Sequence, residues 1–561
     1  MCNIEDSVAT EHNVIIIGGG LIGAFIYLDC ALRGLDPILF ERGDFGAETT
    51  SYNTRLAHGG VRYTARKEDW SLVIESLRER YTLKKIAPHL VHDMDFLLPI
   101  YDGCIDFPLT IESILDSHYL HGGLRRLLQT SLVHAGMSTY DFLGGSRFPF
   151  RFLAKDRLTK HQLLTQKDLL GIRVYSDGKI SSPERLALEA ILKGDEEGGR
   201  SFNYAEVVGF EKEKAGKVEA AIVNSGEAVY TIRGKVIVNA TGPWIDTVNR
   251  LCSGGASSSL LLRVGGIHVA VSSFAGSEVL GKRALVIPTK CPQGQKRLVF
   301  VIPEEGYWLI GTTEKKIDDS CDVLDYKPSR AELESLFDAL RRVMPTFDLN
   351  PDSEEILHVF AGVRPLRRQE MDPTTASRKD LIHYDMRSGV ISVTGKLTPA
   401  RAIAQRVTDL ACRLLGKEEA RCTTAHTPLL GGEPVSERPS EIAARVGIAE
   451  ETAKKLIGTY GWRHREVLAY CEKDNSLRQE VARGCIMAQV CYAVEREKAV
   501  TIADVILRRT DMGKTTKNAG IELVERVGEV MAMRLGWSEE QLRRAVASCT
   551  AEIESRYKVA D

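Results

Sequence analysis

The spacing of apolar residues near the start of the chain predicts a strand, a helix and a second strand in close succession. Residues 14–17 are all apolar and β-branched, which is typical of a strand buried on both faces. Glycines follow at once, residues 21–33 form a helix-like apolar stretch closed by Gly34, and residues 37–41 contain a second apolar run. This order predicts a parallel sheet with helices on its faces.

The rest of the chain divides into a part rich in strand patterns and a helical tail. A helix is predicted at 70–86, and further strands at 235–242, 297–303, 307–311 and 390–393. Beyond Gly431-Gly432 the apolar residues recur at helical spacing, and Thr501 and Asp504 are spaced as a capping box. We therefore predict a separate helical domain at 425–561, and two or three domains in all for the 561 residues.

Composition and charge exclude some functions and partners. Lys and Arg (74) nearly cancel Asp and Glu (76), so no overall field would attract nucleic acid. An anion site must then be a local cluster of cations. None of the twelve cysteines falls in a Cys-x-x-Cys pair, which fits a reducing cytoplasm. Acidic residues among the first thirteen argue against a signal peptide, and the apolar stretch 14–28 is too short to span a membrane.

The turn after the first predicted strand has the spacing Gly-x-Gly-x-x-Gly. Gly18 permits a tight turn, Gly20 lets the backbone approach a pyrophosphate, and Gly23 lets helix and strand pack closely. The start of the following helix offers unpaired N–H groups to phosphates, and Glu41 can accept hydrogen bonds from a ribose. We therefore expect a dinucleotide in contact with Gly18, Gly20, Leu21, Ile22, Gly23, Glu41 and Arg42.

Two features favour FAD over NAD as this dinucleotide. The glycine motif stands at the start of the chain, with more than 500 residues after it. A later strand ends in Ala240-Thr-Gly242, which resembles the second nucleotide-contacting strand of flavoproteins with two dinucleotide-binding motifs. A plain strand and turn remains the alternative for this second feature. The cofactor that we predict is FAD.

The segment 49–63 resembles the part of FAD-dependent glycerol-3-phosphate dehydrogenases that wraps the flavin and then reaches the substrate. Its sequence is Thr49-Thr-Ser-Tyr-Asn-Thr-Arg-Leu-Ala-His-Gly-Gly-Val-Arg-Tyr63. Further matches follow in the same order at 239–244, 299–303, 310–313, 362–366 and 395–398, and in the tail at 459–461 and 507–510. The resemblance covers nearly the whole chain.

This resemblance implies the α/β (α+β overall) fold of the D-amino-acid-oxidase-like flavoproteins. We expect a Rossmann-type FAD-binding domain at 12–70, with further segments near 170–250 and 355–420, and a β-sheet substrate or cap domain at 71–169 and 251–354, followed by the C-terminal all-α domain. The implied reaction is hydride transfer from C2 of glycerol 3-phosphate to flavin N5, which gives dihydroxyacetone phosphate. The implied FAD contacts also include Thr50, Arg55, Leu56, His58, Gly59, Gly60, Val207, Ala240, Gly242, Lys396, Leu397 and Thr398.

A phosphate monoester carries close to two negative charges, so its site needs several cations. By the resemblance, the cations around the substrate are Arg62, Arg364, Arg378 and Lys396. Each charge-assisted hydrogen bond is worth about 1.5–3 kcal/mol, and Tyr63 can add one more. A surface salt bridge is the alternative for each arginine. This alternative is weakest for Arg364, because Arg364 lies between Val363 and Pro365 in a matched motif.

Oxidising an alcohol also requires a base for the hydroxyl proton. His268, in Gly266-Ile-His268, matches the strand histidine of the family, and imidazole titrates in the useful range. From the residues alone, a buried core histidine is the alternative. The resemblance favours a catalytic role for His268 together with Arg364, and it places His58 against the flavin.

Five positions, at four places in the sequence, depart from the usual pattern of the family. Gly265 stands where lysine is usual, Thr394 where glycine is usual, Glu314 where aspartate is common, and Pro399-Ala400 replaces Thr-Tyr. We expect Gly265 and Thr394 to lie near the site. They leave room for another phosphorylated or carboxylated 2-hydroxy or amino acid substrate, or for a flavin-binding scaffold without activity.

The tail gives no sign of a second redox centre. One part of the chain, Asp29-Cys-Ala-Leu-Arg-Gly34, resembles the anaerobic members of the family, whose C-terminal domain binds iron–sulfur through clustered cysteines. That chemistry needs several thiolates in close spacing, and residues 511–518 contain no cysteine. We expect no metal site, and electrons must then pass from FAD to a quinone, to oxygen or to a protein partner.

The resemblance favours quinone, and with it contact with a membrane. Segment 123–132 is a candidate, since its leucines at 124, 127, 128 and 132 fall on one helical face beside Arg125 and Arg126. Arginines in that place can meet anionic headgroups. Packing on the protein's own core is the alternative for such a stripe. The expected location is the cytoplasm, with peripheral contact on the inner face of the cell membrane, and a homodimer is left open.

Overall fold

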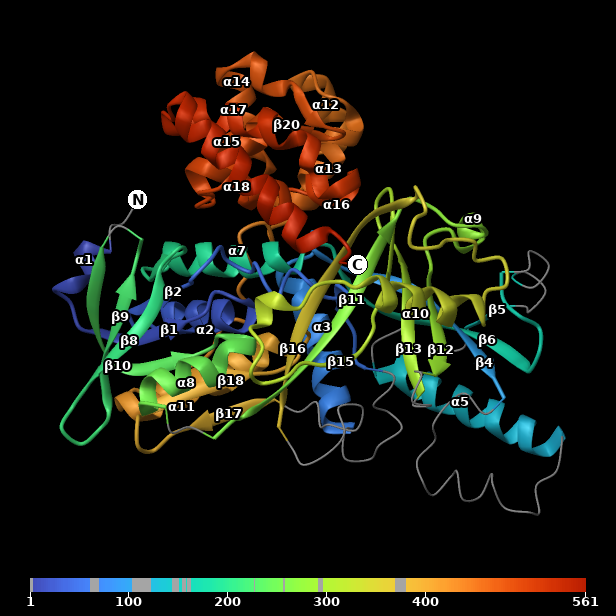
Figure 1. Cartoon of the computed structure of the whole chain (residues 1–561), viewed down its shortest axis with the longest axis horizontal. Coiled ribbons are helices and arrows are strands. Elements are labelled where there is room, and N and C mark those ends of the chain that lie inside the picture. The colour runs from blue at the N-terminus through green and yellow to red at the C-terminus, as the bar shows by residue number, and fades with distance from the viewer. Residues whose placement is uncertain are drawn as a thin grey trace.

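The computed structural model contains two β-sheets and a C-terminal body of helices (Figure 1). It describes residues 4–60, 70–102, 123–143, 151–153, 158, 163–226, 228–255, 258–290, 296–368 and 380–560. The two sheets follow one another along the long axis of the molecule, and the helical body stands over the region where they meet. The predicted fold class, with a Rossmann-type part, a sheet-based part and a helical tail, is confirmed.

The first sheet is the one that the N-terminal pattern predicts. In spatial order its strands are β17 (Leu381–Tyr384), β18 (Val390–Thr394), β10 (Val229–Asn239), β1 (His12–Ile17), β2 (Pro37–Phe40) and β7 (Arg200–Phe202), and β8 (Glu206–Lys212) and β9 (Val218–Asn224) form a hairpin attached through β10. β1 pairs in parallel with β2 and with β10, and β10 pairs in parallel with β18. The predicted parallel arrangement is therefore confirmed for these strands.

Burial on both faces explains the apolar run of residues 14–17 in β1. One face of the sheet is covered by α2 (Leu21–Leu32), α7 (Pro183–Glu196) and α11 (Ala400–Leu415), and the other by the β8–β9 hairpin and α8 (Ile245–Ser253). Val14 and Ile16 pack toward the three helices, whereas Ile15 and Ile17 pack toward the hairpin. Because alternate residues of a strand face opposite sides, a strand between two layers must be apolar at every position.

The second sheet is mostly antiparallel and larger. In spatial order its strands are β15 (Lys315–Lys316), β11 (Leu261–Val271), β14 (Trp308–Gly311), β13 (Lys296–Pro303), β12 (Ala284–Lys290), β4 (Val91–Tyr101), β6 (Leu169–Ile180) and β3 (Leu56–Ala57), with β16 (Ile356–Arg367) paired to β11 and β5 (Arg151–Leu153) paired to β6. The strands predicted at 297–303 and 307–311 are β13 and β14. β6 and β16 fall in segments that we predicted for the FAD-binding domain, near 170–250 and 355–420, yet both pair within this second sheet.

Helices cover both faces of the second sheet, and β11 separates two cores. On one side lie α9 (Ser277–Leu280) and α10 (Arg330–Arg341), and on the other α3 (Trp70–Ile86), which is the helix predicted at 70–86, and α5 (Gly123–Leu143). Ile267 and Val269 of β11 pack with α10, whereas Ala270 packs with the core of α3 and α5. His268 points to the same side as Ala270, because residues two positions apart in a strand face the same side of the sheet.

The helical tail has its own hydrophobic core. Its elements are α12 (Pro439–Val446), α13 (Glu450–Tyr460), α14 (His464–Lys473), a small hairpin of β19 (Glu480–Ala482) and β20 (Cys485–Ile486), α15 (Met487–Arg496), a π-helical turn at Asp504–Arg509, α16 (Met512–Thr515), α17 (Val524–Leu535) and α18 (Glu539–Tyr557). The predicted capping box is present, since Thr501 N–H donates to Asp504 Oδ2 and Asp504 N–H donates to Thr501 Oγ1. Across the described residues, no helix is both long enough and apolar enough to cross a bilayer.

Candidate active site

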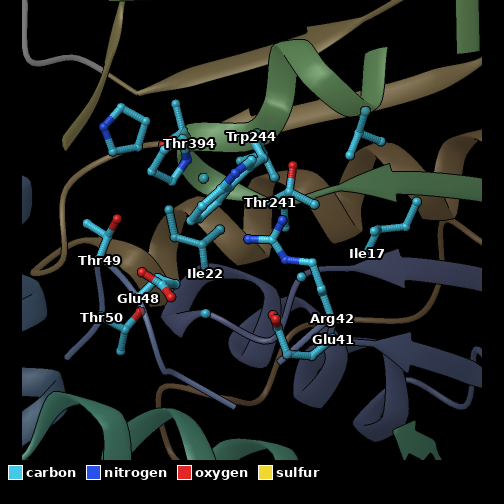
Figure 2. Close-up of a pocket in the computed structure, with 18 of the residues that line it drawn as sticks. Ile17, Ile22, Glu41, Arg42, Glu48, Thr49, Thr50, Thr241, Trp244 and Thr394 are labelled. Atoms are coloured by element: carbon cyan, nitrogen blue, oxygen red, sulfur yellow. The ribbon is translucent and has the colours of Figure 1, made fainter. Parts of the chain in front are cut away.

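Two adjoining cavities lie where the sheets meet. The first is lined by the turn between β1 and α2, the end of β2, residues 46–50, the end of β10 and the turn after β18 (Figure 2). The second lies against β11 and β16 of the other sheet. Both cavities are lined by Thr49, by Pro365 and by residues 394–397. A ligand in the first cavity can therefore reach the second without leaving the protein.

The glycine turn leaves room for backbone only. Gly18 has φ of +107°, and a Cβ built on it would lie 2.6 Å from the carbonyl oxygen of Ala240. A Cβ on Gly23 would lie 1.9 Å from the carbonyl oxygen of Gly18. Helix α2 begins directly after Gly20, so its first N–H groups and its positive dipole end face the cavity. This cradle fits the pyrophosphate of a dinucleotide.

Glu41 fastens the turn at the ribose end of the cradle. One carboxylate oxygen accepts from Gly19 N–H at 2.7 Å, and the other accepts from Gly43 N–H at 2.9 Å. Burial raises the pKa of the Glu41 carboxyl, and these two donors act against the rise. Each oxygen keeps a second lone pair, so Glu41 can still accept hydrogen bonds from a ribose.

A flat platform borders the same cavity (Figure 2). The guanidinium of Arg42 lies over the ring of Trp244, 4.5 Å from its centroid. Sequence reasoning included Arg42 but missed Trp244, which follows Ala240-Thr-Gly242 by two residues and belongs to a matched segment. An aromatic residue soon after a strand that resembles a nucleotide-contacting strand was the feature that could have identified Trp244 as a cavity residue.

Most of the predicted FAD residues line the two cavities. The first cavity is lined by Gly18, Gly20, Leu21, Ile22, Glu41, Arg42, Thr50, Val207, Ala240, Gly242, Lys396 and Leu397. The second cavity is lined by Leu56, His58 and Thr398, and again by Lys396 and Leu397. Thr50 also accepts a hydrogen bond from Leu21 N–H at 3.1 Å through its Oγ1. The wrapping segment and the glycine turn are thus joined directly.

Arg55 lies elsewhere, which differs from the expectation. Its backbone has φ of +54°, and its side chain is buried away from both cavities. The Nη1 group of Arg55 donates to the hydroxyl of Tyr307 at 2.5 Å, and the side chain borders a cavity toward the helical tail. The matched segment did not indicate where the Arg55 side chain points. Its left-handed backbone turns the side chain away from the cavities that other residues of the segment line.

Gly23, Gly59 and Gly60 do not line either cavity. Gly23 serves the close contact between α2 and the turn described above. A Cβ on Gly59 would lie 2.6 Å from both the Leu77 side chain and the Tyr140 hydroxyl, so this glycine lets helices α3 and α5 approach the segment. Gly60 has φ of +85°, a backbone conformation that glycine favours.

His268 and Arg364 project into the second cavity from neighbouring strands. In the register of β11 and β16, Val264 is opposite Arg364 and His268 is opposite Phe360. Positions 264, 268, 360 and 364 therefore share one face of the sheet. The pleat brings the predicted base and the predicted phosphate ligand to the same cavity, although they are almost 100 residues apart in the sequence.

The imidazole of His268 is held tightly and is 2% exposed. Its Nε2 lies 3.0 Å from Thr54 Oγ1, and its ring stacks on Phe360 with centroids 5.2 Å apart. Nδ1 has no hydrogen-bond partner among the described residues. Burial, together with the charges of Arg364 and Arg55, lowers the pKa of His268 to about 3. The imidazole is therefore neutral at neutral pH and can accept a proton.

Arg364 is oriented by three groups on the turn after β14. Its Nη2 donates to Thr312 Oγ1 at 2.6 Å and to the carbonyl oxygen of Thr313 at 3.2 Å. Its Nη1 lies 3.4 Å from Glu314 Oε1. Glu314 is one of the departures noted in the sequence, and it lies at the same cavity. Thr54 and Thr312 were not predicted as site residues, although both belong to matched segments, because nothing in those segments distinguishes them from the neighbouring threonines.

The remaining predicted cations are only partly visible. Lys396 lines both cavities, at the turn between β18 and α11. Arg62, Tyr63 and Arg378 lie outside the described residues. The described part of the cation cluster thus consists of Arg364 and Lys396.

The two departures nearest the motifs have different surroundings. Thr394 lines both cavities, at the place where they join (Figure 2). Gly265 faces the opposite side of β11 from His268, and a Cβ on it would lie 2.4 Å from the ring of Tyr326. Gly265 is next to Gly266, on which a Cβ would lie 2.6 Å from Arg364 Nη2. A side chain at position 265 would nevertheless point away from the cavity, because one step along a strand reverses the face. Of the two, Thr394 is the one that borders the site.

Comparisons with known proteins agree on one family. Residues 13–410 match the family described as FAD dependent oxidoreductase, and residues 422–542 match the C-terminal domain of alpha-glycerophosphate oxidase. The chain is 30% identical to a glycerol-3-phosphate dehydrogenase of Synechocystis, covering 97% of both proteins. It is 29% identical to an aerobic glycerol-3-phosphate dehydrogenase of Staphylococcus haemolyticus, covering 95% of this chain and 92% of that protein.

A solved structure extends the likeness to three dimensions. The X-ray structure of glycerol-3-phosphate dehydrogenase from Bacillus halodurans, complexed with FAD, is 25% identical and has a TM-score of 0.73, covering 99% of this chain and 96% of that one. The predicted cofactor is thereby confirmed as FAD, and the cradle at Gly18 fits it. The chain belongs to the family of FAD-dependent glycerol-3-phosphate dehydrogenases.

Proposed function

We propose that the chain oxidises the C2 hydroxyl of sn-glycerol 3-phosphate to the ketone of dihydroxyacetone phosphate. One observation supports this above all. A buried, neutral histidine and a fixed arginine project from one face of the second sheet into a cavity that joins the FAD cavity at residues 394–397. FAD, when bound, supplies a two-electron acceptor for the hydride that leaves C2.

In this proposal, Arg364 and Lys396 bind the phosphate. Arg364 presents a guanidinium whose direction is set by Thr312 and Thr313 before substrate arrives, so less entropy is lost when the phosphate binds. Glu314 partly offsets the positive charge of Arg364. The predicted ligands Arg62, Tyr63 and Arg378 belong to the same proposal.

His268 is the proposed base for the C2 hydroxyl proton. In the free protein, the positive charge of Arg364 contributes to the low pKa of His268. A phosphate dianion on Arg364 offsets this charge and raises the pKa of His268 toward the range where imidazole is an effective base. Substrates that carry the phosphate would thus strengthen their own base, and glycerol would not.

Thr54 completes the proposed arrangement. Its hydroxyl lies 3.0 Å from His268 Nε2 and borders the same cavity. The hydroxyl can either accept a hydrogen bond from Nε2–H or donate one to an unprotonated Nε2, and the direction of this bond is linked to the tautomer of the ring. It therefore positions the imidazole for proton transfer.

Product analysis tests the proposal. With a soluble quinone as acceptor, the purified protein should convert glycerol 3-phosphate to dihydroxyacetone phosphate, with one quinone reduced for each ketone formed. Glycerol and 2-hydroxy acids should react far more slowly at the same concentration. A 2-hydroxy acid as the preferred substrate would contradict the proposed role of the cations.

We also propose that quinone is the acceptor and that the protein contacts an anionic membrane from the cytoplasmic side. The sequence support is the leucine stripe of segment 123–132 with its two arginines. The backbone of this segment is the start of helix α5, but the side chains of Leu124, Leu127, Leu128 and Leu132 lie outside the described residues. The stripe therefore remains a prediction.

A further inference from the structure

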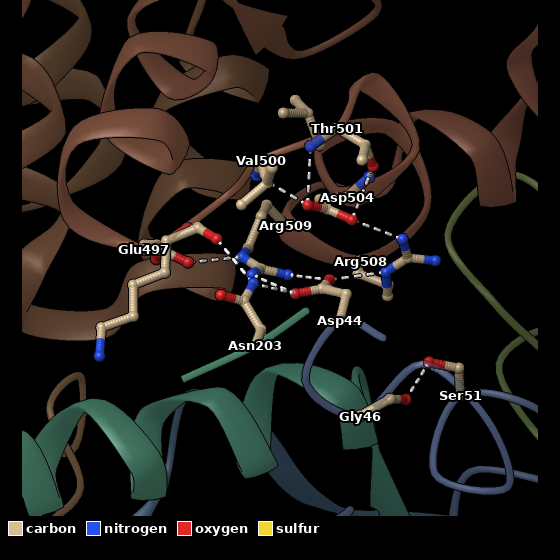
Figure 3. Close-up of polar contacts among 12 residues, drawn as sticks. Asp44, Gly46, Ser51, Asn203, Glu497, Val500, Thr501, Asp504, Arg508 and Arg509 are labelled. Carbon is tan, nitrogen blue, oxygen red and sulfur yellow. Dashed lines mark hydrogen bonds and ion pairs between the residues drawn. The ribbon is translucent and has the colours of Figure 1, made fainter. Parts of the chain in front are cut away.

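The segment 44–55 lies between the two cavities and the helical tail. On one side, Thr49 and Thr50 line the FAD cavity and Thr54 contacts His268. On the other side, Asp44 pairs with Arg508 and Arg509 of the tail (Figure 3). Glu48 lines the FAD cavity and also pairs with Arg556 of the tail. The tail therefore contacts the segment that carries much of the FAD cavity, although it lines neither cavity itself.

Asp44 is the centre of this contact. It is 2% exposed, and its Oδ2 accepts from Arg508 Nε at 2.7 Å and from Arg509 Nη1 at 2.6 Å. Its Oδ1 accepts from Arg509 Nη2 at 2.7 Å and from Asn203 Nδ2 at 3.2 Å. Burial alone would raise the pKa of Asp44, but Arg509 and Arg508 lower it to about 2. The carboxylate is thus ionised and fully paired.

The two arginines are fixed within their own domain (Figure 3). Arg508 Nη2 donates to Asp504 Oδ1 at 2.6 Å, and Arg509 Nε donates to the carbonyl oxygen of Glu497 at 3.0 Å. Asp504 also belongs to the capping box with Thr501. The pair of guanidinium groups is therefore oriented by the tail and directed at one carboxylate on the FAD-binding part.

Hydrogen bonds of the backbone link the residues on either side of Asp44 to the glycine turn. Gly43 N–H donates to Glu41, as described above, and Gly46 N–H donates to the carbonyl oxygen of Gly19 at 3.0 Å. Ser51 Oγ donates to the carbonyl oxygen of Gly46 at 2.6 Å. A shift of Asp44 would therefore move both the ribose end of the cradle and the wrapping segment.

A second contact lies at the end of the chain. Arg556 Nη2 donates to Glu48 Oε1 at 2.5 Å. The ring of Tyr557 lies 6.0 Å from that of Tyr52 and 6.4 Å from that of Phe360, between centroids. Phe360 is the ring on which His268 stacks. Helix α18 thus supports the wall behind the proposed base as well as the FAD segment.

We propose that the C-terminal helical domain is a clamp that holds segment 44–55 against FAD, through the buried cluster of Asp44, Arg508 and Arg509 and the outer pair of Glu48 and Arg556. The matched motif Leu507-Arg-Arg-Thr510 acquires a role in this way, as a positioning element for FAD. The proposal concerns FAD binding and stands whatever the substrate.

Titration of the apoprotein with FAD, followed by flavin fluorescence, tests the clamp. Arg509→Met leaves the buried Asp44 with one arginine, and it should raise the Kd for FAD by about tenfold or more, equal to about 1.4 kcal/mol. The outer pair is about a quarter exposed. Glu48 also lines the FAD cavity, so the pair is tested from the tail side, and Arg556→Met should raise the Kd by only about threefold. At saturating FAD, both variants should recover much of their kcat, since the clamp acts through the cofactor.

Arg173→Met is the matched control. Arg173 and Asp141 form an equally buried pair at 3.0 Å between β6 and α5, away from segment 44–55. This variant should lower the melting temperature but leave the Kd for FAD within about twofold of the wild type. If Arg509→Met lost as much melting temperature as Arg173→Met but bound FAD with the Kd of the wild type, the cluster would only join the domains.

Linkage supplies a second readout on the unmutated protein. If the tail stabilises FAD binding, FAD must stabilise the docking of the tail by the same free energy. FAD should therefore slow amide hydrogen exchange across 500–510 in the wild type, by about tenfold or more, even if Arg509→Met fails to fold. Equal exchange with and without FAD in this stretch would overturn the proposal.

Discussion

At the scale of single residues, Arg364 is surrounded by groups that set the direction of its side chain. Its partners are a hydroxyl, a carbonyl oxygen and one carboxylate at 3.4 Å. The guanidinium is thus held at the cavity that it lines together with His268.

Replacing Arg364 by alanine tests its contact with the phosphate. We expect Arg364→Ala to lower kcat/KM for glycerol 3-phosphate by about 2–4 kcal/mol in transition-state free energy, because a charge-assisted bond to a dianion is lost. Glycerol lacks the phosphate, so its slower reaction should change far less. Arg368→Ala, directly after β16, is the control and should leave kcat/KM unchanged for both substrates. Equal losses for both substrates would show that Arg364 is structural.

The low pKa of His268 also has a consequence for stability. In an unfolded chain the ordinary pKa of histidine is about 6.5, whereas in the folded protein that of His268 is about 3. Between these values the unfolded state binds a proton that the folded state does not. The free energy of unfolding must therefore fall as the pH falls through this window, by about 2 kcal/mol at pH 5.

A variant without the imidazole isolates this contribution. The melting temperature of His268→Gln should fall less between pH 7 and pH 5 than that of the wild type. His358 has the same direction of shift, to about 3, so part of the acid sensitivity should remain. An identical acid dependence in His268→Gln and wild type would contradict the burial of a neutral imidazole.

At the scale of elements, the glycine turn is the feature with the least tolerance for change. Gly23→Ala places a methyl group 1.9 Å from the carbonyl oxygen of Gly18, so α2 or the turn must move. We expect FAD affinity to fall by about 1–3 kcal/mol, the usual range for overpacking, measured by fluorescence titration of the apoprotein. Gly458→Ala is the matched control in α13, where a Cβ meets nothing within 4 Å. The Gly458→Ala change should leave FAD affinity unchanged. If Gly23→Ala also left it unchanged, the tight glycine turn would not be needed for FAD binding.

The first sheet could be predicted because its signals are local. A buried parallel strand has a continuous apolar sequence, and the turn that follows needs glycines at set spacing. For the second sheet, the pattern predicted separate strands at β13 and β14, and the resemblance implied a β-sheet domain without its strand order. Its pairing of β11 with β16 joins residues almost 100 positions apart, and no local pattern specifies such a partner.

The candidate site shows the same limit. Gly18, Glu41 and His268 were predicted from a motif or from a matched segment. The direction of Arg55 depends on one left-handed backbone torsion, and that of Gly265 depends on strand phase. Trp244 and Thr54 acquire their roles only from the approach of distant segments. Side-chain direction is thus the information that the sequence carried least well.

At the scale of the whole molecule, electrons must leave the reduced flavin. We expect the protein to sediment with anionic liposomes and to reduce a soluble quinone much faster than oxygen. Leu127→Asp should weaken the sedimentation, because a charge on the apolar face opposes burial among lipid chains. Met533→Asp, at an exposed position of α17, is the control and should leave it unchanged. Stoichiometric hydrogen peroxide without liposome binding would make the protein an oxidase of the same family.

The central claim is that FAD and the cavity of His268 and Arg364 act together on a phosphorylated alcohol. Anaerobic addition of glycerol 3-phosphate to the FAD-bound protein, followed by flavin absorbance in a stopped-flow instrument, tests this without any acceptor. We predict complete bleaching near one equivalent, none at that concentration of glycerol or a 2-hydroxy acid, and a rate roughly 10²–10⁴-fold lower in His268→Ala with FAD still bound. A flavin that stays oxidised with glycerol 3-phosphate, or is bleached equally by a 2-hydroxy acid, would contradict the account.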